Sequence, residues 1–170
     1  MAKSKVKLKL EPLRKLIAEM PLKVAVDSNR EIAKTVKEKI LSFVERGISP
    51  IEGMGRFPSY KPNQGNKKKY PDTVRGEFPG KRRRPVNLSL SGKFLRSLKS
   101  YVKSRNIIEV GFTDDRSKIL EAGHRFGANG QGKRPIIPLA QNGEDFVKSI
   151  KLAITKIYRD NVIQYLKKSK

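Results

Sequence analysis

The feature that most limits how this chain can fold is a stretch of 39 residues, 48–86, that follows neither helical nor strand periodicity. It contains six prolines, five glycines and two runs of consecutive basic residues. A connection of this length is uncommon inside a compact domain and is usually functional or ordered by a partner. At about 3.3–3.6 Å per residue, it could extend on the order of 130 Å. We therefore expect a long basic loop that can reach a neighbouring molecule.

Positive charge is concentrated in irregular segments of this kind. The chain has 39 Lys and Arg residues against 16 Asp and Glu, a net charge of +23 that points to an acidic or polyanionic partner. Residues 61–84 contain nine basic and two acidic side chains, and residues 1–24 contain seven and two. By contrast, residues 27–46 contain five and four, and residues 144–160 contain four and three. The excess of positive charge is therefore expected on extended arms, and such arms often become ordered only when they bind a partner.

Two helices frame the expected domain. Ser28 and Glu31 fit a capping box, apolar residues then recur at helical spacing, and Gly47 is a natural helix stop. These signals predict a helix over 28–46. A second run of apolar residues at helical spacing predicts a helix over 144–165.

Shorter elements are expected between these helices. Residues 100–104 and 107–112 should form two strands around a turn, because apolar residues alternate in the second. A short helix is predicted over 118–126. Residues 134–139 contain two prolines and should form an edge strand or an extended connector, since proline cannot donate in a central ladder. The period-two pattern of residues 5–10 fits either a strand or a disordered basic tail.

These patterns predict an α+β fold: a small antiparallel sheet packed by two longer helices, with long extended arms. The length of 170 residues suits one domain. We expect a basic N-terminal arm over 1–26, followed by a single α+β domain over 27–170 that carries the long basic loop at 48–86.

Catalytic and metal-binding groups are sparse. His124 is the only histidine and the chain has no cysteine, so a His/Cys metal site cannot be built. The adjacent acids Asp114 and Asp115 are typical turn residues, and no glycine segment carries the Lys-Ser/Thr of a phosphate-binding loop. We expect no enzymatic activity and no cofactor, and we expect the His124 ring to pack near the short helix. No apolar run approaches the roughly 18 residues that span a bilayer, so no membrane association is expected.

The basic clusters of the long loop are the one positive biochemical signal. They could neutralise phosphates, with bases stacking on the nearby Phe57, Tyr60 and Tyr70. They could equally bind acidic patches on a protein neighbour, and the residues alone support both partners. The candidate contact residues are Lys67, Lys68, Lys69, Lys81, Arg82, Arg83 and Arg84.

Several short motifs follow the long loop in a fixed order. They are Leu88-Ser-Leu-Ser-Gly92, Leu95-Arg-Ser-Leu98, Val110-Gly111 at the end of the hairpin, Ala122-Gly-His-Arg-Phe-Gly127 and Arg134-Pro-Ile-Ile-Pro138. In this order they resemble the core of the tail-completion and minor-tail families of tailed phages, which include the virion-morphogenesis family of Mu-like phages. The resemblance covers residues 54–140, about half of the chain.

That resemblance implies a structural virion protein that forms a ring at the head–tail junction. It implies a cyclic homo-oligomer (hexamer or dodecamer), assembled in the host cytoplasm, with other neck, portal or tail proteins as partners and DNA passing through the lumen. A stopper, a tail terminator and a tail-to-head joining ring all fit. The residues expected at the subunit interface are Tyr60, Tyr70, Arg134, Pro135 and Pro138. The alternative, from charge alone, is a nucleic-acid-binding protein such as a ribosome-associated or packaging factor.

Overall fold

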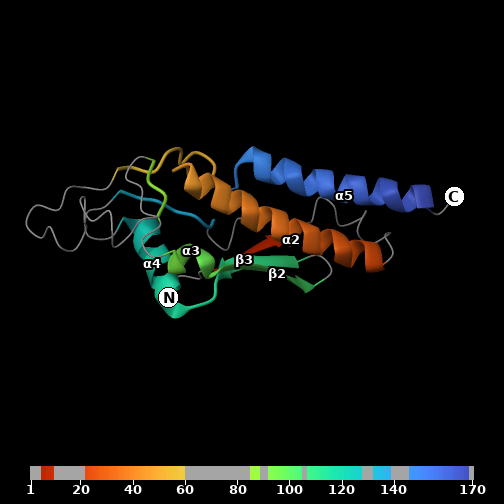
Figure 1. The fold of residues 1–170 in the computed structure, drawn as a ribbon, viewed down its shortest axis with the longest axis horizontal. Helices are drawn as coiled ribbons and strands as arrows, with labels where there is room; N and C mark the ends of the chain where they lie inside the picture. The colour runs from red at the N-terminus through yellow and green to blue at the C-terminus, as the bar shows by residue number, and fades with distance from the viewer. Residues whose placement is uncertain are drawn as a thin grey trace, which may run out of the picture.

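The structure is a computed structural model. It describes residues 5–9, 22–59, 85–88, 92–104, 107–127, 132–138 and 146–168. The elements labelled in Figure 1 are β1 (Lys5–Lys9), α2 (Leu22–Glu45), α3 (Lys93–Arg96), β2 (Leu98–Ser104), β3 (Ile107–Phe112), α4 (Asp115–Phe126) and α5 (Lys148–Lys168). The expected α+β class, a small antiparallel sheet packed by two longer helices, is confirmed.

The described strands form one three-stranded antiparallel sheet in the order β1-β3-β2. β3 is central because it pairs with β1 along one edge and with β2 along the other. Both of its faces are also covered: Ile108, Val110 and Phe112 are fully buried, and Glu109 on the opposite face is buried as well. Glu109 is satisfied by the Tyr101 hydroxyl and by the Lys103 ammonium, which donates to it at 2.7 Å. The ion pair raises the pKa of Lys103. β2 and β3 form the predicted hairpin, and β2 begins two residues before the expected 100–104.

The molecule is built in three layers. Figure 1 shows α2 lying across the sheet, with α5 on the far side of α2. The apolar residues of α2 recur every three or four positions, so they gather on one side of the helix, and this side is buried. Its fully buried apolar residues are Ala25, Ile32, Val36, Ile40 and Val44. α5 contributes Ile150 and Tyr158 to the same core.

The N-terminal part of the chain differs from the expected arm over 1–26. Residues 5–9 form β1, which pairs with β3 in a register that places Val6 opposite Val110. α2 begins at Leu22, directly after Pro21, instead of at residue 28. Ser28 therefore lies inside the helix, where its hydroxyl donates to the Val24 carbonyl at 2.7 Å. The capping-box interpretation is wrong, because Ser28 is fully buried inside α2, where its hydroxyl accepts from the Asn161 amide of α5 at 3.1 Å.

The described ends of segment 48–86 pack against their own chain. Ile48 forms an isolated bridge with Arg56, and the Phe57 N–H donates to the Gly47 carbonyl at 2.8 Å. Gly47 has a φ of 72°, and a Cβ at this position would lie 2.5 Å from the Cβ of Pro85. Only glycine allows both the left-handed turn and this close approach. The extended loop that the sequence predicts therefore cannot include residues 48–59 or 85–86. The Phe57 side chain is buried, so it is not available to stack on bases.

The helices flanking the C-terminal connector also shift from their predicted ends. α4 begins at Asp115, three residues early, because the Asp114 carboxylate caps it by accepting from the Ser117 N–H at 2.8 Å. Hydrogen bonds from the Ser117 side chain and backbone lower the pKa of Asp114. α5 runs over 148–168 instead of 144–165, because Phe146 is held outside the helix in a bridge with Ile51.

Candidate functional site

Most of the residues predicted to contact a partner lie outside the described part of the chain. They are Tyr60, Lys67, Lys68, Lys69, Tyr70, Lys81, Arg82, Arg83 and Arg84. The structure neither brings these residues together nor separates them. The remaining candidates, Arg134, Pro135 and Pro138, belong to the connector between α4 and α5.

This connector is buried within its own subunit. Arg134 is fully buried, and its guanidinium donates to the carbonyls of Pro58 and Ser59, each at 3.0 Å. The Pro135 carbonyl accepts from the Ser49 hydroxyl at 2.8 Å, and Pro135 and Pro138 are both buried. Their expected place at a subunit interface stays a prediction, because the structure shows only the contacts within one subunit. The side chains are used inside the chain, tying residues 132–138 to the start of the long segment.

The last turns of α4 complete this buried cluster. The Arg125 guanidinium pairs with Glu121 at 2.5 Å and also donates to the Ile137 carbonyl, and both side chains are almost fully buried. Burial raises the pKa of Glu121, while the charge of Arg125 opposes that rise. Sequence reasoning missed this pair. Its only local signal was the four-residue spacing of opposite charges on a helix.

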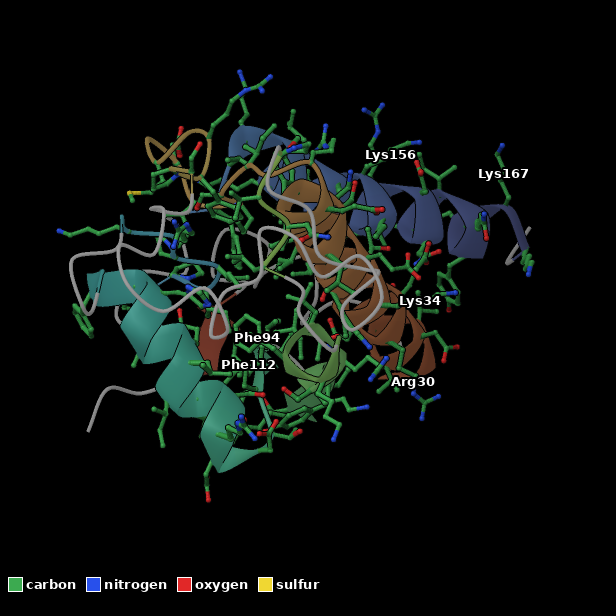
Figure 2. All side chains as sticks on the ribbon, turned by 60° about the vertical axis from the view of Figure 1, so that its left-hand side comes forward. Arg30, Lys34, Phe94, Phe112, Lys156 and Lys167 are labelled. Atoms are coloured by element: carbon green, nitrogen blue, oxygen red, sulfur yellow. The ribbon has the colours of Figure 1, made fainter. Side chains whose placement is uncertain are left out.

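His124 packs against aromatic side chains. Its ring centroid lies 5.6 Å from that of Phe94, which stacks on Phe112 at 4.7 Å, as Figure 2 shows for the two phenylalanines. Burial, together with the nearby charge of Arg134, lowers the pKa of His124 to about 4, so the ring is neutral at neutral pH. The expected packing of His124 near the short helix is confirmed. Within the described ranges, no three His, Cys, Asp or Glu side chains are grouped so that they could hold a metal ion.

A second polar cluster joins α2 to α5. The Tyr158 hydroxyl donates to the Asn29 side-chain oxygen, and both residues are fully buried. One turn on, the Asn161 amide donates to Ser28 and to Glu31, each at 3.1 Å. Burial raises the pKa of Tyr158. The helix pattern alone predicted an apolar contact here, so this polar contact between residues 129 apart in sequence was missed.

α5 has the largest excess of basic over acidic residues among the described helices and strands. α5 contains six basic residues and one acidic residue, Asp160. This corrects the expectation of a nearly balanced helix. That count included Glu144 and Asp145, which precede the observed helix, and it omitted Lys167 and Lys168, which end it. Figure 2 shows Lys156 and Lys167 pointing away from α2, whereas Arg30 and Lys34 point out from α2 on the other side.

Exposed apolar side chains gather on two elements. On α4, Ile119 is 72% and Phe126 is 62% exposed, and their seven-residue spacing places them on one side of the helix. On α5, Leu152 and Leu166 are each 57% exposed, and Ile163 is 40% exposed. Figure 1 shows α4 and the C-terminal half of α5 at opposite ends of the long axis. The described body thus offers two separate surfaces for contact.

Comparisons with protein-family models, curated proteins and solved structures gave no match to this chain. None of the helices in the described ranges is both long enough and apolar enough to cross a bilayer.

Proposed function

We propose that this protein is a structural component of a tailed-phage virion and forms a ring at the head–tail junction. The observation that carries the proposal is the order of the motifs from Leu88 to Pro138, which resembles the tail-completion and minor-tail families. These motifs have structural uses in the fold. Leu98 and Val110 are fully buried in the core, and Arg134 ties the connector to the start of the long segment.

The arrangement of exposed surfaces supports assembly into a ring. A ring needs a head-to-tail contact, in which one surface of a subunit meets a different surface of the next. α4 carries the exposed Ile119 and Phe126 and lies at one end of the body, so it supplies one such surface. Each contact is repeated around the ring, so modest contacts add up.

Particle size and electron microscopy test this proposal. Purified full-length protein, examined by sedimentation and by negative-stain imaging, is expected to form closed rings of six or twelve copies. In intact virions the chain should be located at the neck, where its layer distinguishes a stopper, a tail terminator and a joining ring. A protein that stays monomeric and is absent from the particle would overturn the proposal.

The second candidate function is nucleic-acid binding, favoured by the clusters at 67–69 and 81–84. Replacing Lys81, Arg82, Arg83 and Arg84 by Gln should then abolish binding to duplex DNA. Wild-type binding should weaken steeply as salt rises, because phosphate contacts release counterions. Binding that is unchanged in the Gln variant would reject this function.

A further inference from the structure

One side of α5 is packed and the other is open along its whole length. Ile150 and Tyr158 are fully buried and face α2. The opposite side carries residues spaced by three or four positions, which places them in one stripe on a helix. This outer α5 stripe comprises Leu152, Lys156, Arg159, Ile163, Leu166 and Lys167.

The outer α5 stripe mixes apolar and basic side chains. Its three aliphatic residues are 40–57% exposed, and all of its members are exposed to solvent. Two basic side chains of α5 have acidic neighbours: Lys151, beside the stripe, pairs with Glu52 at 3.0 Å, and Lys156, within it, lies 3.9 Å from Asp160. The helix still carries five more basic than acidic residues. A face of this kind is complementary to a surface that is both apolar and negatively charged.

We infer that the outer α5 stripe binds an acidic amphipathic helix of a partner protein. Leucine-rich positions of that helix pack on Leu152, Ile163 and Leu166, and its flanking carboxylates pair with the basic side chains between them. An amphipathic helix seated along a preformed apolar strip is a common recognition mode. The inference rests on α5 alone and does not depend on the ring proposal.

The distribution of charge in the stripe favours a protein partner over a nucleic acid or a bilayer. A phosphate backbone would pair with the basic side chains but would leave three aliphatic side chains in contact with water or polar groups. A helix that lies in a membrane surface keeps its charges at the edges of its apolar face. Here Arg159 lies between Leu152 and Leu166 on the stripe itself, so insertion into lipid would bury a charge. Two copies of this stripe carry the same excess of basic side chains, so a contact between stripe and stripe would be repulsive.

Binding of a designed probe to the full-length chain tests the inference. The probe is a fluorescent helical peptide of about 21 residues with Leu at heptad a and d positions and Glu at the flanking positions. Poly-glutamate of equal length, a duplex DNA and vesicles containing phosphatidylserine are compared by anisotropy or co-sedimentation at physiological salt. The probe is expected to bind about tenfold or more tightly than poly-glutamate, because apolar contact adds to charge.

Two variants and one matched control locate the binding surface. Lys156→Glu combined with Arg159→Glu should weaken probe binding about tenfold or more, and Leu152→Ser combined with Leu166→Ser should weaken it about fivefold. The control, Arg30→Glu combined with Lys34→Glu, makes the same change of charge on the opposite side of the molecule (Figure 2) and should alter binding less than about twofold. All four side-chain sites on α5 are exposed, so the variants should keep the wild-type circular dichroism spectrum.

Three results would overturn the inference. They are equal binding of the probe and poly-glutamate, equal weakening by the α5 and α2 charge variants, and a stripe-dependent affinity for DNA or vesicles without one for the probe. A fourth result would also overturn it: the protein self-associates as its concentration rises, the α5 variants abolish this self-association, and the probe does not bind. That outcome would assign the stripe to a second copy.

Discussion

Arg134 holds together segments that are far apart in the sequence. Its guanidinium is fully buried and serves two carbonyls, those of Pro58 and Ser59, 76 and 75 residues away. Replacing it by Met keeps much of its volume but leaves those acceptors without this donor. We expect Arg134→Met to lower the free energy of unfolding by about 2–4 kcal/mol. Urea unfolding followed by circular dichroism measures this loss.

An exposed arginine provides the control for Arg134. Arg116 lies on the solvent side of α4, so Arg116→Met should change stability by no more than about 0.5 kcal/mol. Equal effects of the two substitutions would show that the buried hydrogen bonds of Arg134 contribute little to stability.

His124 should make stability depend on pH. Folding lowers its pKa from 6.5 to about 4, so between these values the unfolded chain binds a proton that the folded chain does not. Above pH 6.5 the imidazole is neutral in both the folded and the unfolded chain, so its titration does not lower the free energy of unfolding. As pH falls from 6.5 toward 4, the free energy of unfolding falls. The loss is on the order of 3 kcal/mol, because the two pKa values differ by about 2.5 and each pKa unit corresponds to 1.36 kcal/mol.

His124→Gln isolates this effect because it removes the titrating group. From pH 7.5 to pH 4.5, the free energy of unfolding of the wild type should fall more steeply than that of the variant, as measured by urea unfolding at each pH. Parallel pH profiles for the two proteins would contradict the burial of a neutral His124.

Between the two long helices, the contact of Tyr158 with Asn29 combines packing with a buried hydrogen bond. Tyr158→Phe removes only the hydroxyl, so the ring still fills its place but Asn29 loses a donor. We expect a loss of about 1–3 kcal/mol, because burying an unsatisfied polar group costs that much. Thr155→Val is the matched control on the exposed side of α5 and should change stability by less than about 0.5 kcal/mol. A stability change of the same size in both variants would show that the hydroxyl is dispensable.

The elements with strong local signals could be predicted from the sequence. The alternating residues of 107–112 predicted β3, and the helical repeat from Ile32 to Val44 predicted most of α2. The helix ends could not be predicted as well, because they depend on tertiary contacts. Phe146 has the spacing of a helix residue, yet its bridge to Ile51 keeps it outside α5.

The polar contacts that fix the fold could not be predicted from local sequence. Arg134 reaches Pro58, and Tyr158 reaches Asn29, only after the layers have been assembled. The apolar spacing of a helix indicates which side is buried. It does not indicate which polar residue of another element will form a hydrogen bond on that side. The charge on α5 was misjudged for a related reason, since shifting the helix by a few residues exchanged two acidic residues for two basic ones.

For the whole molecule, net charge dominates the electrostatics. The chain carries +23, while several described ion pairs, such as Lys118–Asp115, lie at the surface. Surface pairs contribute at most about 1 kcal/mol each, whereas like charges in excess repel one another throughout the folded body. Repulsion between like charges should therefore outweigh attraction within pairs, and screening the charges should stabilise the folded state.

The melting temperature should consequently rise by a few degrees as NaCl increases from about 0.02 M to 0.5 M, a range over which the screening length falls several-fold. Replacing Lys81, Arg82, Arg83 and Arg84 by Gln lowers the net charge by four, so this variant should show a smaller rise than the wild type. Differential scanning calorimetry of both proteins across the salt series measures the two slopes. A melting temperature that falls with salt would mean that ion pairs such as Lys151–Glu52 stabilise the protein more than its excess charge destabilises it.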